Sequence, residues 1–285
     1  MKPTFLRRTL LVLAAAAAAL ATAGPASAAS ATFAGTASVR GCSGFLVGSP
    51  ASQPGDPALV LTNGHCFDGT RPVPGEVLTD RRTNTPVNLL DPAGDRAAVV
   101  VATKALYVSM TGTDVTLSRL DRTYADLDRD YHLRPLQLST QRPTPGTAIE
   151  VVSGALKQKY SCRLDGLVYR VLESGYSTTD VLRYAPECTT GPGTSGSPVI
   201  DAATGQVIGI NNTSNRNGGQ CTVDNPCEMD RSGAISVHKG IGYGTETYWF
   251  TMCLGAGSRL DLSKPGCLLP RPGQTSSTGS VRRNH

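Results

Sequence analysis

Apolar residues along the chain gather in short runs that are separated by glycine, proline, asparagine and aspartate. The runs are mostly four to six residues long and rich in β-branched side chains, a pattern typical of the strands of barrels and sandwiches. They cover residues 44–47, 58–62, 97–102, 114–117, 148–152, 167–172, 181–184, 198–200, 206–210 and 234–237. This pattern predicts an all-β protein with no long amphipathic helix before residues 245–254, which fit either a helix or a final strand.

Three polar segments divide the chain. Residues 121–130 mix charges of both signs, and we interpret them as a solvated loop. Residues 134–147 contain three prolines and fit a crossing between two halves. The segment from Arg271 onward is rich in serine, threonine, glycine and proline, which predicts a disordered tail over residues 271–285. We therefore expect two β domains, over residues 42–134 and 135–270.

The first residues have the pattern of an export signal. Lys2, Arg7 and Arg8 precede an apolar run, and Ala26-Ser27-Ala28 supplies the small residues that a signal peptidase needs. The run is shorter than the roughly 20 apolar residues of a membrane anchor. We expect residues 1–28 to be removed, residues 29–41 to form a short propeptide or N-terminal arm, and the protein to be secreted without a membrane contact.

The charge balance indicates no acidic partner. The whole chain has 27 basic and 22 acidic residues, and 24 basic residues remain without Lys2, Arg7 and Arg8. Such a near-neutral chain has no stripe of basic residues for a nucleic acid. We expect a monomer that binds neither nucleic acid nor membrane.

All eight cysteines lie beyond the export signal. An even number of cysteines outside the cytoplasm argues for disulfides. Eight cysteines allow about 105 pairings, so the sequence alone does not fix them. We expect sequential pairing, and no metal site, because the spacing does not suit thiolate ligands and histidines are scarce. The expected pairs are Cys42–Cys66, Cys162–Cys188, Cys221–Cys227 and Cys253–Cys267.

A serine and a histidine lie in settings that suit acyl transfer. Ser195 lies between glycines in Gly193-Thr194-Ser195-Gly196-Ser197-Pro198, and His65 follows an apolar run and Asn63-Gly64. A serine hydroxyl becomes a useful nucleophile when an imidazole takes its proton and fixed donors hold the oxyanion that forms.

The motifs around these two residues resemble those of secreted trypsin-like serine proteases with the chymotrypsin fold. The resemblance covers the chain from Gly41 to about Trp249, and Gly-Thr-Ser-Gly-Ser-Pro is closest to the bacterial glutamyl endopeptidase branch. It rests on four blocks in the family's order: Gly41-Cys42-Ser43-Gly44, Thr62-Asn63-Gly64-His65-Cys66, Asp114-Val115-Thr116-Leu117 and Gly193 to Pro198. It implies two packed six-stranded antiparallel β-barrels with a catalytic cleft between them, and it supports the pair Cys42–Cys66.

The resemblance also implies a role for each residue of a triad: His65 as general base, Asp114 as the carboxylate that orients it, and Ser195 as nucleophile. Asp114 lies 49 residues after His65 and 81 before Ser195, close to the family's separations. A buried aspartate that accepts the imidazole N–H selects the tautomer and stabilises the imidazolium. Three other aspartates lie in a turn or in the mixed-charge loop and fit the role less well: Asp95, Asp121 and Asp126.

The oxyanion hole and the substrate pocket follow from the same resemblance. The backbone N–H groups of Gly193 and Ser195 would hold the oxyanion, and a side chain at position 193 would obstruct the substrate. Thr194 replaces the aspartate of digestive members, so activation by an inserted amino terminus is not expected. The pocket residues would be Thr189, Asn211 and Asn212, to which Asp224 or Glu228 could add charge.

These features predict a secreted serine endopeptidase that acts on proteins or peptides and needs no cofactor. Two alternatives remain. One is a serine esterase built from Ser195, Asp224 or Asp230, and His238, although its fifth motif position holds Ser197 instead of the glycine of a nucleophile elbow. The other is a catalytically inactive binding protein on the same fold.

Overall fold

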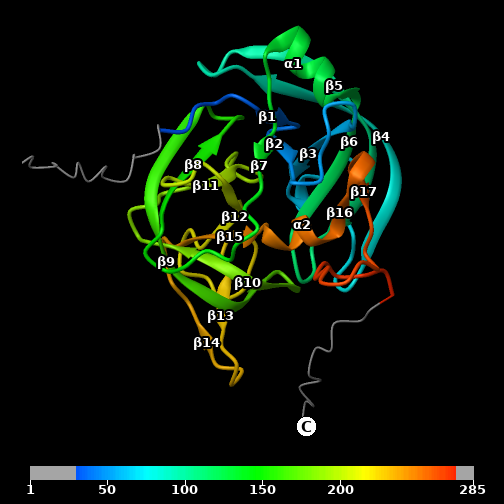
Figure 1. Cartoon of the computed structure of the whole chain (residues 1–285). Coiled ribbons are helices and arrows are strands. Elements are labelled where there is room, and N and C mark those ends of the chain that lie inside the picture. The colour runs from blue at the N-terminus through cyan, green and yellow to red at the C-terminus, as the bar shows by residue number, and fades with distance from the viewer. Residues whose placement is uncertain (1–29, 274–285) are drawn as a thin grey trace, which may run out of the picture.

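The computed structural model describes residues 30–273 (Figure 1). The expected export signal, residues 1–28, lies outside the described residues, as does the expected tail beyond residue 273. The described residues form two large, mainly antiparallel β-sheets that lie side by side and a third sheet of two short strands, so the all-β fold expected from the hydrophobic pattern is confirmed.

The first sheet takes its strands from the first half of the chain. Its order is β1-β4-β5-β6-β3-β2-β7, and an additional pairing of β1 with β2 closes a ring of six strands. The strand bounds are β1 Thr36–Val39, β2 Cys42–Gly48, β3 Pro57–Thr62, β4 Val77–Leu90, β5 Arg96–Ser109, β6 Val115–Thr123 and β7 Leu136–Gln137. Because β1 pairs with both β2 and β4, the segment before Cys42 is part of the sheet.

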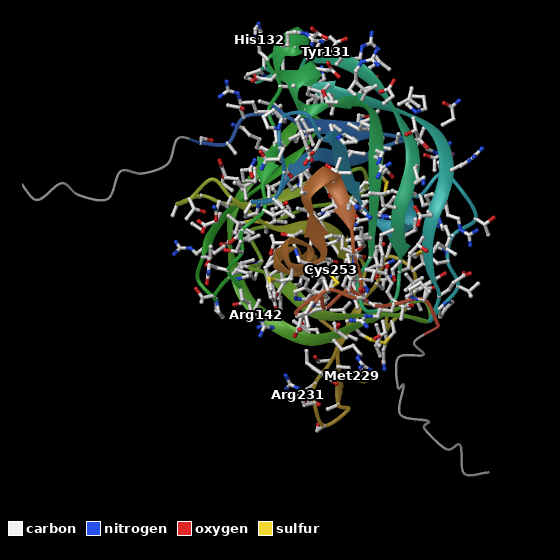
Figure 2. The ribbon with its side chains drawn as sticks, turned by 45° about the vertical axis from the view of Figure 1, so that its right-hand side comes forward. Tyr131, His132, Arg142, Met229, Arg231 and Cys253 are labelled. Carbon is white, nitrogen blue, oxygen red and sulfur yellow. A yellow bond between two sulfur atoms is a disulfide. The ribbon has the colours of Figure 1, made fainter. Side chains whose placement is uncertain are left out.

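The second sheet repeats this arrangement with a projecting hairpin. Its order is β10-β15-β12-β11-β8-β9-β13-β14, and the pairing of β9 with β10 closes a second ring of six. The strand bounds are β8 Ala148–Ser153, β9 Gln158–Glu173, β10 Tyr176–Tyr184, β11 Pro198–Asp201, β12 Val207–Ser214, β13 Cys227–Met229, β14 Ile235–Ser236 and β15 Gly242–Glu246. Figure 2 shows Met229 and Arg231 on the β13–β14 hairpin, at the opposite end of the molecule from Tyr131 and His132.

Two segments of the described chain form short α-helices. The sequence predicts a loop for the first and leaves the second undecided between a helix and a strand. The mixed-charge segment is not a solvated loop: it continues β6 and then forms α1, Tyr124–Tyr131. The Thr123 hydroxyl and the Asp126 carboxylate form a reciprocal capping box at its N-terminus, and this local signal outweighs the high charge. The undecided segment at 245–254 contains α2, Tyr248–Cys253. The remaining elements are η1 Gly64–Cys66, β16 Leu254–Gly255, η2 Ala256–Ser258 and β17 Arg259–Leu260.

Four disulfides link the cysteines in sequential pairs, as the sequence analysis expects. They are Cys42–Cys66, Cys162–Cys188, Cys221–Cys227 and Cys253–Cys267. No helix within residues 30–273 is long and apolar enough to cross a membrane.

The C-terminal segment joins the two halves. After α2 the chain returns to the first sheet, where the Tyr107 hydroxyl donates to the Pro270 carbonyl at 3.0 Å. Buried side chains from both sheets and from this segment form one apolar cluster that includes Phe45, Leu61, Ile200, Ile210, Trp249, Phe250 and Leu269. Burial of these side chains stabilises the contact between the halves.

Candidate active site

His65 is held by the local structure that follows β3. It lies in η1, and the adjacent Cys66 is joined to Cys42 at the start of β2. A Cβ on Gly64 would overlap the Ser109 carbonyl oxygen and lie 2.8 Å from Oδ1 of Asp114. Glycine at position 64 therefore allows the histidine turn to pack directly against the segment that carries Asp114.

Asp114 lies immediately before β6, with 6% of its surface exposed. Its Oδ2 is 2.8 Å from Nδ1 of His65, and its Oδ1 accepts the His65 backbone N–H at 3.0 Å. The Asn63 side-chain amide donates to the Asp114 carbonyl at 2.8 Å. Because an ionised carboxylate only accepts, Nδ1 of His65 must donate, which leaves Nε2 to exchange a proton elsewhere.

The electrostatic surroundings make His65 more basic. Burial alone would lower its pKa, but the charge and the hydrogen bond of Asp114 outweigh burial, so the pKa lies above its ordinary value. Glu173 raises the pKa of His65 further, and Arg71 lowers it. Burial also raises the pKa of Glu173, whose carboxylate accepts the Asp224 backbone N–H at 2.8 Å.

Ser195 lies in the loop between β10 and β11. Its hydroxyl donates to the Asn212 carbonyl at 3.2 Å. Within the part of the chain that the structure describes, Ser195 and the His65 ring share no hydrogen bond, although both residues line one cavity. The structure thus brings the two residues to the same cavity and leaves the serine hydroxyl turned toward Asn212.

The loop that carries Ser195 contains a tight turn and two backbone N–H groups that have no acceptor within the described chain. Thr194 N–H donates to the Gly191 carbonyl at 3.1 Å, and Gly193 has φ +86°. With Pro192 in second position, these are the features of a type II turn. Among residues 30–273, no acceptor pairs with the backbone N–H of Gly193 or of Ser195. Ser195 lines the cavity, and Gly193 lies between its lining residues Pro192 and Thr194 without lining it itself.

The cavity has a volume of about 320 Å³ and is lined by residues of both halves. His65 and Asp114 come from the first half, and Ser195, Asn211 and Asn212 from the second. Asp224 also lines it, whereas Glu228 is buried elsewhere with the Tyr243 hydroxyl at 3.0 Å.

Thr189 is not among the residues that line the cavity. It is exposed, and the neighbouring Thr190 faces the cavity with 9% of its surface exposed. The backbone turns tightly here, with Thr189 N–H donating to Glu187 O at 3.1 Å and Thr190 N–H to Cys188 O at 3.0 Å, and this turn directs Thr190 rather than Thr189 to the cavity. Sequence reasoning also missed Arg71, Glu173 and Arg216, which line the cavity but belong to no motif.

The tip of the β9–β10 hairpin closes one side of the cavity. Gly112 N–H donates to Ser177 O at 2.7 Å, and Thr179 N–H donates to Gly112 O at 3.0 Å. The Tyr176 hydroxyl donates to the Pro72 carbonyl at 3.1 Å. These bonds fasten the hairpin of the second sheet to the first half and so bring Glu173 near His65.

The rival residues have other partners. Asp95 pairs with Lys157 at 3.5 Å, Asp121 with Arg122 at 3.4 Å, and Asp126 caps α1. His238, which an esterase arrangement would use, lies 3.1 Å from Ser236 Oγ and does not line the cavity. None of these residues competes for the position beside Ser195.

Within the described residues, one group of potential metal ligands comes together, formed by Cys42, Cys66 and His65. Both sulfurs belong to a disulfide, so neither is a thiolate that could bind a metal.

A family model described as Trypsin-like peptidase domain matches residues 42–210. No curated protein matches the chain in sequence. Among solved structures, the active form of the Rv3671c protease from M. tuberculosis is 17% identical, with a TM-score of 0.48 over 87% of this chain and 89% of that one. The MamO protease domain from Magnetospirillum magneticum is 14% identical, with a TM-score of 0.44 over 76% of this chain and 94% of that one.

Proposed function

Because the chain belongs to the trypsin-like peptidase family, we propose that it is a serine endopeptidase that works through Ser195, His65 and Asp114. The observation that carries the proposal is the cavity that these three residues line, where the imidazole is already bonded to a buried carboxylate. The same cavity borders a loop with two unused backbone amides.

In the proposed reaction, the Ser195 hydroxyl turns from the Asn212 carbonyl toward Nε2 of His65. His65 takes the hydroxyl proton while Oγ attacks the peptide carbonyl, and the amides of Gly193 and Ser195 donate to the oxyanion. His65 then gives the proton to the leaving amine, which leaves an acyl-enzyme. A water molecule, deprotonated by His65, hydrolyses the ester and restores Ser195.

Thr190 and Asn211 line the part of the cavity next to Ser195. Their polar groups support a preference for a substrate with a neutral side chain that forms hydrogen bonds. The Asn211 amide nitrogen donates to the Thr194 carbonyl, so its Oδ1 is the atom left without a partner. The hydroxyl of Thr190 is also buried without a partner in the described chain. Neither atom is exposed in the structure, so a small movement of these side chains would be needed before a glutamine or asparagine amide accepts from Thr190 and donates to Asn211. The carboxylate of a glutamate side chain, which an enzyme of the glutamyl branch would bind, would be repelled by the partial negative charge of Asn211 Oδ1.

Export and domain division remain part of the proposal. Four disulfides support an oxidising environment, and residues 1–28 would direct the chain there. The halves 42–134 and 135–270 would each contribute one wall of the cleft, and we expect the enzyme to act as a monomer.

The proposal is tested with the purified protein and its Ser195→Ala variant. We expect the wild type to cleave peptides from a mixed library and to bind a phosphonofluoridate probe covalently, and the variant to do neither while it keeps the same melting temperature. Ser232→Ala, on the exposed β13–β14 hairpin, is the matched control and should react like wild type. Cleavage of esters without peptides would favour an esterase, and a folded wild-type protein that neither cleaves nor reacts would favour a binding protein.

A further inference from the structure

Two buried serines from different sheets meet behind the loop that precedes Ser195. Ser43 belongs to β2 and Ser153 ends β8, and their hydroxyl oxygens lie 2.9 Å apart. Neither residue has any exposed surface. Both hydroxyls approach the Gly193 carbonyl oxygen, Ser43 at 3.0 Å and Ser153 at 3.4 Å.

The hydrogen atoms can be assigned because each hydroxyl has only one. Ser153 Oγ accepts the Leu156 N–H at 3.2 Å, and Ser43 Oγ accepts the Ala155 N–H at 3.1 Å. The shorter contact to Gly193 belongs to Ser43. Ser153 therefore donates to Ser43, and Ser43 donates to the Gly193 carbonyl, in a chain whose members polarise one another.

Ser43 also binds the carbonyl oxygen of Ser195, two residues after Gly193. Its backbone N–H donates to the Ser195 carbonyl at 2.8 Å. One residue of the first sheet thus binds the carbonyl oxygens of both Gly193 and Ser195. It fixes the peptide planes that follow these two residues, which adjoin at each Cα the planes that carry the proposed oxyanion donors.

This loop needs such restraint. Gly193 lies at φ +86°, and the freedom of glycine lets the peptides on either side rotate at low cost. Within residues 30–273, the Thr194 side chain bonds only to neutral groups, the Gly191 carbonyl and the Asn211 amide. The loop conformation accordingly depends on uncharged hydrogen bonds.

We propose that Ser43 and Ser153 are positioning residues that hold the amides of Gly193 and Ser195 in the conformation that receives the oxyanion. The proposal rests on the proposed function, because it assigns these serines to the oxyanion hole of that reaction. The Ser43 hydroxyl contacts the loop directly, and the Ser153 hydroxyl acts through Ser43.

The test compares Ser43→Ala, Ser153→Ala and the double variant with wild type, on the best peptide from the library and on a peptide trifluoromethyl ketone of the same sequence. This inhibitor forms an oxyanion on Ser195. We expect Ser43→Ala to lower kcat about tenfold or more, less than the 10²–10³-fold cost of removing an oxyanion donor outright. KM should stay within about twofold, and the inhibition constant should rise by the factor by which kcat/KM falls.

The effects of the two substitutions on kcat and on the inhibition constant should not be additive. Ser153→Ala should have a smaller effect than Ser43→Ala, and the double variant should match Ser43→Ala, because the two hydroxyls act in series. The acid limb of the pH profile should not move, since His65 keeps its partners. Ser139→Ala is the matched control, because that buried hydroxyl also donates and accepts, but only within its own turn.

The proposal is overturned if Ser43→Ala and Ser153→Ala lower the melting temperature but leave kcat and the inhibition constant at wild-type values. If Ser43→Ala does not fold, Ser153→Ala decides alone, since it keeps Ser43 in place. Failure of the proposed function is a separate outcome: there, Ser195→Ala would cleave the peptide as fast as wild type.

Discussion

The carboxylate of Asp114 bonds to His65 twice, through Oδ2 to Nδ1 of the ring at 2.8 Å and through Oδ1 to the backbone N–H at 3.0 Å. One contact fixes the tautomer of the ring, and the other fixes the turn that carries it. The carboxylate is therefore both an electrostatic partner and a structural anchor of the histidine.

Replacement of Asp114 by asparagine should separate these two contributions. Asp114→Asn removes the charge and can present an N–H to Nδ1, which stabilises the wrong tautomer, so we expect kcat to fall by about 10⁴-fold. The melting temperature and the circular dichroism spectrum report whether the turn survives. A loss of less than about tenfold in a folded variant would assign the role to another group.

Two residues of the cavity should move the acid limb of kcat/KM in opposite directions. The reaction needs neutral His65, and its pKa is raised, so activity should appear only as pH rises through a value above about 6.5. Glu173→Gln removes a negative charge and should shift the limb to lower pH. Arg71→Gln removes a positive charge and should shift it to higher pH.

Both shifts should shrink at high ionic strength, because salt screens charges that water reaches. The measurement is kcat/KM between pH 5 and 9 at low and high salt. Shifts of the same sign in the two variants would contradict the electrostatic account of the His65 pKa.

Two glycines of the nucleophile loop should respond differently to alanine. A Cβ on Gly196 would overlap the Ser43 carbonyl oxygen, and the residue has φ +85°, whereas a Cβ on Gly191 would meet nothing within 4 Å. We expect Gly196→Ala to lower the free energy of unfolding by at least about 1–3 kcal/mol and to abolish activity. Urea unfolding checks this, with Gly191→Ala as the matched control. Equal stability of the two variants would show that the loop adjusts to a side chain at 196.

Glu246 should make stability depend on pH. Burial raises its pKa to about 7, even though Arg142 lies 3.3 Å away and lowers it. A raised carboxyl pKa means that the folded state holds the proton more tightly, so stability falls as pH rises from about 4.5 to 7.

Glu246→Gln keeps the shape and removes the charge. We expect it to raise the free energy of unfolding at pH 8, by at most about 3 kcal/mol, and to have little effect at pH 4. Thermal unfolding at both pH values measures the difference. A variant that is less stable at pH 8 would mean that the ion pair with Arg142 outweighs burial.

Much of this arrangement could be predicted from sequence because it depends on local chemistry. Glycines on both sides of Ser195 mark places where backbones approach closely, as the position of Gly196 against Ser43 shows. The short β-branched runs predicted both sheets. The sequential cysteine pairs coincide with four disulfides of the structure.

What the sequence did not reveal depends on contacts between distant segments. Glu173 reaches the cavity only because a hairpin of the second sheet is fastened to Gly112 of the first half. Ser43 and Ser153 are 110 residues apart, and neither stands in a motif that marks it as a partner of Gly193. The mixed charges of residues 121–130 favour a solvated loop, whereas the helix Tyr124–Tyr131 depends on the capping box of Thr123 and Asp126.

After α2 the described chain returns to the first half, since Pro270 is bound to Tyr107 and Leu269 lies in the common core. This return segment ties the two halves together in addition to the linker and to the hydrogen bonds between Gly112 and the β9–β10 hairpin. Their separation would require this return segment to leave the core, at the free-energy cost of exposing its apolar side chains. The width of the cavity between the halves should then be nearly constant. This favours extended peptide segments over folded protein surfaces as substrates of the proposed protease.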